Sequence, residues 1–335
     1  MNDGANEKTP ERWANSLGMQ FLAVAPGTFE MGSPRTEPRR FADETPRRTT
    51  LTQLFYLSKF PTTQAEWRAV VGTNPSKNRG VKRAPVERVS WIDCVDFIEK
   101  LNSDEYLLEL TTFLGPEWRY GLPTEAQWEF ACRAGTTTAY SFGETATGVE
   151  GAFGRFVGGS RDGEGEGDEG AGRTGGGGRA EGVGRTEGVG RTEGVGRTGG
   201  GGRAEGVGRT GGGGRAEGVG RTGGGGGGVE NGGGRGRVAT VGGETTCDVG
   251  LFAPNPWGFC DMHGNVCEWT VDRYGEYDPA RNVDPIGASS GAERVARGGS
   301  WRSPAENCRS ASRFNFLATY RGDNCGLRVG IFRRN

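Results

Sequence analysis

The chain has 335 residues and a formal net charge of −1, from 41 basic and 42 acidic side chains. This balance excludes a strongly basic nucleic-acid scaffold as the default interpretation, and no apolar run approaches the roughly 18 residues that span a membrane. The seven cysteines are an odd number with no Cys-x-x-Cys pair, and the first residues are polar and charged, so we expect reduced thiols and a cytoplasmic location. The single histidine, His263, excludes a metal centre built on several imidazoles of one chain.

The N-terminal part of the chain is predicted to form a polar lead-in followed by strands. Residues 1–18 are polar and charged, and we interpret them as the lead-in. Apolar residues alternate from Met19 to the turn signal Pro26-Gly27, and the sequence that follows it to Met31 completes the pattern of a β-hairpin. Residues 49–57 (TTLTQLFYL) are rich in strand-forming residues and are predicted to form a second strand region.

Three helices are predicted from their first residues. Each begins with a Ser or Thr that is followed three residues later by Glu, Asp or Gln, the pattern of a capping box, and then by apolar residues at helical spacing. The starts are at Thr63, Ser90 and Thr124. Gly72 and Gly135 follow the first and third helices and are expected to end them.

Residues 143–236 are a glycine- and arginine-rich tract of low complexity. From Gly172 the tract repeats with a period of six, in units such as GRTGGG and GRAEGV, and it holds most of the 65 glycines. Burial of its few apolar residues cannot offset the conformational entropy that the tract would lose on ordering. We therefore predict a flexible, disordered insertion. RNA binding by the arginines is the alternative, which the lack of aromatic residues and the presence of Glu disfavour. Without the tract about 240 residues remain, enough for one large domain or two small ones.

Several segments outside the tract occur in an order that resembles a known family. The segments are FLAVAPGTFEMGS (21–33), FYLSKFPTTQAEWRAVVGTNPS (55–76), PVERVSWIDCVDFIEKLN (85–102), YGLPTEAQWEFACRAGTTTAYSFG (120–143), NPWGFCDMHGNVCEWTVDRYG (255–275) and RVARGGSW (294–301), followed by GLRVGIF. This series resembles the formylglycine-generating-enzyme (sulfatase-modifying factor) family, which implies a loop-rich, C-type-lectin-like α+β fold. On that resemblance residues 19–142 and 237–335 form a single lectin-like domain, and residues 294–335 hold a candidate variable region.

The resemblance also implies a test for catalysis. Formylglycine-generating enzymes oxidise a substrate cysteine with a copper(I) ion held by two cysteine thiolates. Counted from the GGSW motif, those two positions fall on Ser303 and Cys308. A serine hydroxyl is a poor ligand for copper(I), so we expect no catalytic residues and no enzyme activity. The alternative is a formylglycine-generating oxidase that acts on a cysteine-containing, sulfatase-type peptide. Its second thiolate would have to come from Cys325, which the spacing does not support.

The C-terminal segment resembles the variable region of proteins diversified by retroelements, which share this fold. In that system asparagine codons are randomised through a template RNA, and Lys, Glu, Gln, Met and Trp cannot be produced. None of these types occurs at the thirteen positions that we interpret as variable and ligand-binding, which alternate with frame residues such as Arg313 and Arg321. The thirteen are Arg302, Ser303, Pro304, Ser312, Phe314, Asn315, Phe316, Leu317, Tyr320, Gly322, Asp323, Asn324 and Cys325.

The function implied is that of a receptor-like, ligand-binding protein whose partner, an unidentified protein or other macromolecule, is held by residues 302–325. No membrane or nucleic-acid partner is expected. Phe314, Phe316, Leu317 and Tyr320 follow no helical or strand period, which predicts an exposed recognition patch, although aromatic residues of this kind also build cores. A structural or regulatory module without diversification is a third interpretation.

Two residues are candidates for a metal site. Asn265 and Glu268 lie in the segment GNVCEW, which matches a calcium-binding segment of the family, and hard oxygen ligands suit Ca²⁺. Calcium is therefore the candidate ion for this segment, and we expect that the chain requires no cofactor. Hydrogen bonding of these two side chains within a loop is the alternative. Trp301 and Cys308 are expected in the core, and His263 is expected to have a structural role.

Overall fold

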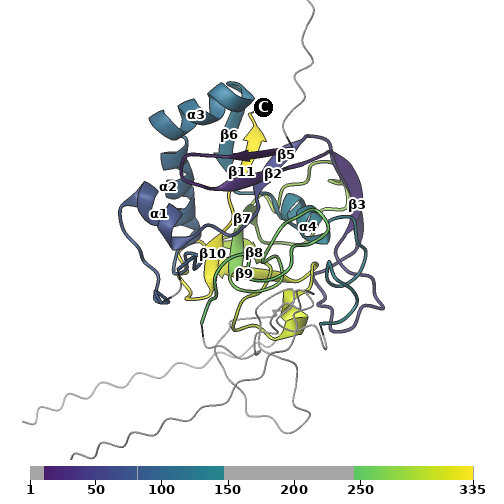
Figure 1. The fold of residues 1–335 in the computed structure, drawn as a ribbon. Helices are drawn as coiled ribbons and strands as arrows, with labels where there is room; N and C mark the ends of the chain where they lie inside the picture. Colours follow the sequence, from purple (N-terminus) through teal and green to yellow (C-terminus); the bar gives the residue numbers. More distant parts are fainter. Residues whose placement is uncertain (1–10, 81, 147–244, 335) are drawn as a thin grey trace, which may run out of the picture. The chain divides into compact units, whose positions relative to one another are not determined.

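A computed structural model describes residues 11–80, 82–146 and 245–334 (Figure 1). The predicted insertion lies outside the described residues apart from its first four positions, and the predicted lead-in is described only from residue 11. Those last residues of the lead-in belong to the fold, because strand β1 (Arg12–Ala14) pairs with the next strand and Trp13 stacks on Phe21 at 5.6 Å between ring centroids.

The larger sheet has five strands in the order β1-β2-β5-β11-β6, and all neighbours are antiparallel. It brings the last strand of the chain between strands from the N-terminal half. Its further members are β2 (Gln20–Val24), β5 (Phe55–Ser58), β11 (Gly330–Arg333) and β6 (Trp118–Gly121).

The smaller sheet has four strands in the order β10-β7-β8-β9, and it carries the candidate variable region. β10 runs parallel to β7, and the other two pairs are antiparallel, so β9 is an edge strand. Its members are β10 (Cys325–Leu327), β7 (Cys267–Arg273), β8 (Glu293–Arg297) and β9 (Arg313–Leu317). A separate two-stranded sheet pairs β3 (Gly27–Met31) with β4 (Arg47–Leu51), and a short 3₁₀ helix covers Ala305–Cys308.

The hairpin predicted across Pro26-Gly27 is wrong. β2 pairs with β1 and β5, whereas β3 pairs with β4 in another sheet, so the turn leads from one sheet to the next. The predicted strand 49–57 is likewise two strands. Between them, the backbone N–H of Thr52 donates to the carboxylate of Asp284 at 2.8 Å and so leaves the ladder.

The three predicted helices are confirmed. Helices α1 (Gln64–Val71), α2 (Trp91–Leu101) and α4 (Glu125–Arg133) all begin with complete capping boxes. α1 ends at Gly72 in the left-handed conformation, whereas Ala134, one residue before the predicted glycine, takes that role in α4. Helix α3 (Asp104–Leu114) was not predicted, and Ser103 at its start makes no side-chain capping bond.

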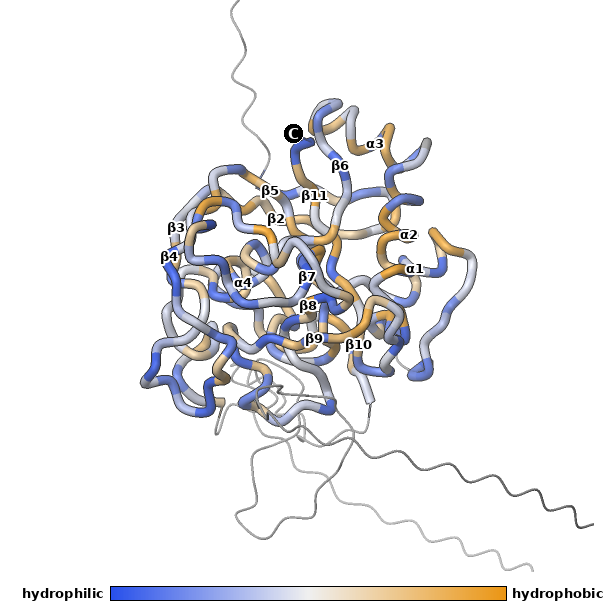
Figure 2. The backbone as a smooth tube through the Cα atoms, turned by 180° about the vertical axis from the view of Figure 1, so that it is seen from behind, coloured by the Kyte–Doolittle hydropathy of each residue, from blue (hydrophilic) through white to orange (hydrophobic). Residues whose placement is uncertain are grey.

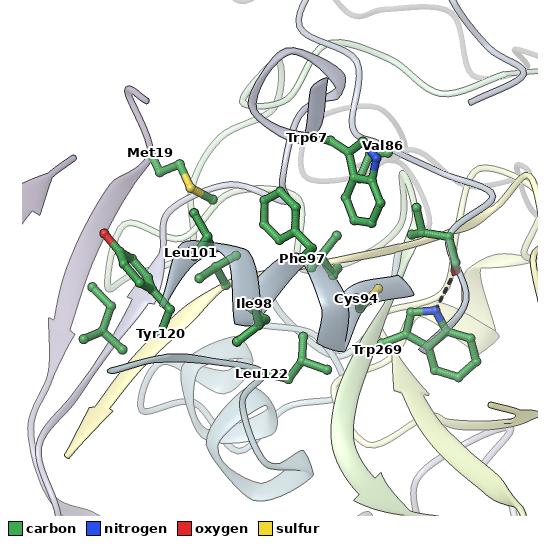
Figure 3. Close-up of a cluster of buried hydrophobic side chains, with 14 of the residues drawn as sticks. Met19, Trp67, Val86, Cys94, Phe97, Ile98, Leu101, Tyr120, Leu122 and Trp269 are labelled. Carbon is green, nitrogen blue, oxygen red and sulfur yellow. Dashed lines mark hydrogen bonds between the residues drawn. The ribbon is translucent and has the colours of Figure 1, made fainter. Parts of the chain in front are cut away.

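Helix α2 packs against strands of both larger sheets and forms the centre of the main core (Figure 3). Phe97 stacks on Trp67 of α1 at 4.8 Å, and the indole of Trp269 on β7 donates to the carbonyl of Val89 at 3.0 Å. Hydrophobic and hydrophilic colours alternate along α2 in Figure 2, as expected of a helix with one buried face. All seven cysteines are buried. In the described parts of the chain, no helix is long and apolar enough to cross a membrane.

Candidate functional site

The candidate variable segment runs around the four-stranded sheet from one edge to the other. After β8 the chain forms a first loop that contains the short 3₁₀ helix and then continues as edge strand β9. A second loop leads from β9 to β10 at the opposite edge of the sheet (Figure 1). This second loop, residues 318–324, lies against the start of α2. The N–H of Ile92 donates to the carbonyl of Ala318 at 3.3 Å, and Arg321 forms a bidentate ion pair with Asp93 at 2.7 Å.

Two buried arginines fix the segment before β9 and the first residue of β9. Arg309 pairs with Glu37 at 2.5 Å and with Glu44 at 2.7 Å. Arg313 pairs with Glu125, the first residue of α4. Burial lowers the pKa of Arg313, but the attraction of Glu125 outweighs it and raises that pKa above its usual value, so the guanidinium stays charged. Ion pairs of this kind lose much of their stability when one partner is removed, because the other charge is left buried.

Two further buried arginines hold the strands behind the surface. Arg297 of β8 pairs with Glu129 of α4 and donates to the carbonyl of Ser312. Arg328, between β10 and β11, pairs with Glu268 and donates to the carbonyl of Ser58 at 2.9 Å, which connects the two larger sheets. Together these four arginines, which we call the arginine frame, anchor the segment at both ends. The frame consists of Arg297, Arg309, Arg313 and Arg328.

Three aromatic rings form a stacked column along the β9 edge. Phe314 and Phe316 are nearly parallel with centroids 6.3 Å apart, and Tyr320 stacks on Phe316 at 4.6 Å. The edge of Trp269, which is fully buried, meets Phe316 at 5.9 Å. Tyr320 is 39% exposed, whereas the two phenylalanines are half-buried. The aromatic column, Phe314, Phe316 and Tyr320, is therefore the rim of the main core and also part of the surface.

A charged cluster lies beside the column. Asp323 accepts hydrogen bonds from Lys77 at 3.1 Å and from Arg302 at 3.0 Å, and its carbonyl accepts one from the indole of Trp301 at 3.2 Å. Burial raises the pKa of Asp323, but the two cations outweigh this effect and hold the pKa below its usual value. Trp301 is half-buried and contributes to this surface rather than to the core.

Four of the thirteen candidate positions are buried and do not lie on the surface. Ser303 accepts a bond from the N–H of Ser300 at 3.1 Å, and Ser312 donates to the carbonyl of Glu306 at 3.2 Å. Cys325 lies opposite Cys267 in the parallel pair, and a Cβ at Gly322 would lie 2.6 Å from the hydroxyl of Tyr320. The remaining nine are wholly or partly exposed: Arg302, Pro304, Phe314, Asn315, Phe316, Leu317, Tyr320, Asp323 and Asn324.

The residues considered for calcium have other partners. Both carboxylate oxygens of Glu268 accept bonds from Arg328 at 2.8 Å, and one also accepts a bond from the indole of Trp128 at 2.7 Å. The amide of Asn265 exchanges hydrogen bonds with the backbone of Cys247. A calcium ion needs six or more oxygen ligands, and on Glu268 it would meet the guanidinium of Arg328, so this donor set does not fit the ion. Among the described residues, no group of three or more His, Cys, Asp or Glu side chains is placed to hold a metal.

The thiol expected at a copper site is deeply buried. Burial raises the pKa of Cys308 well above its usual value, which disfavours the thiolate that copper(I) requires. His263 lies beside it. The N–H of Ser141 donates to His263 Nε2 at 3.1 Å, which assigns the imidazole proton to Nδ1 and its bond to the carbonyl of Cys308 at 2.8 Å. Burial lowers the pKa of His263 to about 4, so this neutral imidazole is a packing and hydrogen-bonding element.

This arrangement of two sheets, capped helices and a long C-terminal segment around an edge strand defines a C-type-lectin-like α+β fold, as the sequence resemblance implied. Residues 6–159 and 232–331 match the sulfatase-modifying factor enzyme 1-like domain, and the chain belongs to that family. Two solved structures share the fold over 98% of this chain and their whole length. They are PvdO from Pseudomonas aeruginosa, with a TM-score of 0.60 and 20% identity, and Treponema denticola variable protein 1, with 0.61 and 19%.

Curated relatives are similar over shorter stretches. The serine/threonine-protein kinase pkn1 of Chlamydia pneumoniae is 42% identical over 72 residues, which are 20% of this chain and 12% of the kinase. The chaperone protein LppX of Paenibacillus barcinonensis is 31% identical over 128 residues, 32% of this chain and 44% of LppX. The formylglycine-generating enzyme of Thermomonospora curvata is 39% identical over 61 residues, 17% of this chain and 20% of the enzyme. The matches thus span less than half the length of these relatives.

Proposed function

We propose that the chain is a ligand-binding protein of the retroelement-diversified type, whose C-terminal surface contacts a macromolecular partner and performs no catalysis. The observation that carries this proposal is the aromatic column, which is open at the β9 edge and is held from behind by the arginine frame. The shared fold with a protein named as a variable protein supports it.

A diversified surface needs a frame whose stability does not depend on the varied side chains. The arginine frame meets this need, because its ion pairs are made to carboxylates outside the variable segment, on β7, on α4 and in residues 37–44. The nine exposed positions make few buried contacts by comparison. Substitutions at such positions usually change stability by about 0.5 kcal/mol or less, although Phe314 and Phe316, which touch the core, will cost more.

The same geometry disfavours the oxidase alternative. Ser303 occupies the position of the first family thiolate and is engaged with Ser300. Cys308 is buried, and burial raises its pKa. Cys325 lies on β10, where it is opposite Cys267 of β7. Ser303 thus supplies no thiolate at the first family position, and burial disfavours the ionised form of Cys308 that copper(I) would bind.

The first test is made on the DNA that surrounds the gene. A diversified protein requires a reverse-transcriptase gene nearby and a near-copy of the last part of the coding sequence that differs only at adenines. We expect those adenines at codons of the nine exposed positions and not at those of Ser303, Ser312 or Cys325. A locus without such a copy would overturn the proposal.

The second test is made on the protein. A library randomised at Arg302, Pro304, Leu317, Asp323 and Asn324 should yield mostly folded chains, judged by cooperative thermal unfolding. A matched library at buried positions of the same segment, Ser303, Ser312 and Cys325, should yield mostly unfolded chains. Equal tolerance in the two libraries would contradict the division into surface and frame.

A further inference from the structure

Exposed cations surround the loop at residues 320–324. Lys77 and Arg302 bind the two carboxylate oxygens of Asp323, and Arg321 binds Asp93. The backbone N–H of Arg88 donates to the carbonyl of Gly322 at 2.9 Å, which places a fourth cationic residue at the same loop. Arg88 is exposed and forms no ion pair within the described part of the chain.

In each of the three ion pairs the cation is the outer member. The side chain of Lys77 is 65% exposed and that of Arg302 is 55% exposed, whereas Asp323 between them is 15% exposed. Arg321 is 59% exposed and Asp93 is 24% exposed. Glu87, which precedes Arg88 in the chain, is fully buried and accepts bonds from the backbone N–H groups of Lys77 and Asn78. A partner therefore meets cations first, although the whole chain has a net charge of −1.

The cations lie beside the open end of the aromatic column. Tyr320 stacks on Phe316 on one side, and on the other its hydroxyl lies near Gly322 and Asn324, next to Asp323. An apolar centre with a charged rim is the usual anatomy of a protein interface, and charges at the rim act mainly on the rate of association and on the choice of partner. Here the rim is cationic.

We propose that this cationic rim and the aromatic column together bind an acidic polypeptide surface that presents an apolar side chain to Tyr320. This inference rests on the proposed function and names the class of its partner. A single-stranded nucleic acid fits less well, because base stacking requires open ring faces, and the inner faces of the column already stack on one another.

The experiment selects peptides from a random display library on the immobilised full chain. We expect the enriched peptides to carry net negative charge and at least one apolar residue. The best peptide should bind at least about tenfold more weakly to the double variant Lys77→Glu, Arg88→Glu, and less tightly as salt rises from about 50 to about 500 mM. The double variant Arg12→Glu, Arg48→Glu, which makes the same charge change at exposed positions on β1 and β4, is the matched control and should bind within about twofold.

Two further arms separate this inference from the proposed function. Tyr320→Ala should abolish binding, and Leu108→Ala, at a 67% exposed leucine on α3, should not. If the enriched peptides are neutral or basic and the Tyr320→Ala variant no longer binds them, the assignment of an acidic partner is overturned and the proposed function stands. If the selection on folded protein yields no peptide whose binding depends on Tyr320, both the inference and the proposed function are overturned. Tighter binding of an oligothymidine probe than of the acidic peptide would overturn the polypeptide assignment.

Discussion

Arg313, the first residue of β9, forms a bidentate ion pair with Glu125, the first residue of α4, with Nε–Oε1 at 2.6 Å and Nη2–Oε2 at 2.9 Å. Both side chains are almost fully buried. This contact joins the strand that carries the aromatic column to a helix whose own N-cap, Thr124, is fixed by a capping box. The position of the β9 edge is therefore set by a pair of buried charges rather than by the aromatic side chains that it displays.

We predict that Arg313→Met lowers the free energy of unfolding by about 3 kcal/mol or more, because it leaves Glu125 buried without its main partner. Arg321→Met is the matched comparison. It also removes a guanidinium from a bidentate pair with a carboxylate, but Arg321 is mostly exposed, so the loss should be about 1 kcal/mol or less. Urea unfolding followed by circular dichroism measures both. Equal losses would show that the frame does not depend on buried charge pairs.

Local signals predicted the helices well, because a capping box involves only residues three apart. Thr63, Ser90 and Thr124 each start a helix as expected. α3 has no such signal in the sequence, because Tyr106 rather than an acidic residue or Gln follows Ser103 by three positions. In the structure, Ser103 makes no side-chain capping bond. The hairpin failed because Pro26-Gly27 reports only that the chain turns, and the partner of each strand is set by residues far along the chain.

The candidate surface shows the same limit. Sequence types alone could not separate partly exposed Asp323 from buried Ser312, since both are small polar residues in one segment. Their difference arises from tertiary contacts, such as the bonds from Arg297 and to Glu306 around Ser312. Nor could the sequence show that Lys77 and Arg88, more than two hundred residues away, border the same loop. The one usable signal is that two arginines of the frame, Arg309 and Arg313, lie between candidate positions.

Asp272 gives a prediction about pH. Burial, and next the nearby charge of Glu125, raise its pKa to about 7 from an ordinary value of 3.8. The folded protein thus keeps a proton that the unfolded chain loses, so this residue stabilises at low pH, and its contribution is lost as pH rises from about 4 to about 7. We predict that Asp272→Asn becomes progressively more stable relative to the wild type across this window, by at most about 1.4 kcal/mol per pH unit, and that the difference is constant above it.

Unfolding of the two proteins at a series of pH values measures that difference directly. Other groups that titrate are present in both proteins and cancel in the comparison. A difference that does not change between pH 4 and pH 7 would show that Asp272 is ionised throughout, and hence that it is better solvated or paired than its contacts with the N–H of Glu125 indicate.

His263 titrates in the opposite sense. Burial lowers its pKa from 6.5 to about 4, against the hydrogen bond to the carbonyl of Cys308, which acts to raise it. The unfolded chain therefore takes up this proton first, and stability is lost as pH falls from about 6.5 to about 4. Because the chain has one histidine, a single set of imidazole NMR signals reports it. We expect no titration of these signals between pH 8 and pH 5, and a midpoint near 6.5 in the folded protein would contradict the burial of the ring.

The thiols give the last prediction. All seven are buried, and burial raises the pKa values of Cys94, Cys308 and Cys325 well above the usual value. The reactive species is the thiolate, so both access and ionisation disfavour reaction. We predict that an aromatic disulfide reagent labels the native chain only at the rate of unfolding, and labels all seven thiols at once in denaturant.

Thr319→Cys supplies the internal standard, because it adds one thiol at an exposed position between β9 and β10. It should react within the mixing time of the same experiment, while the native seven stay protected. If Cys308 reacted as fast as the introduced thiol in native protein, it would be accessible and ionisable. That is what a copper-binding thiolate needs, and the case for binding without catalysis would then fail at its most specific residue.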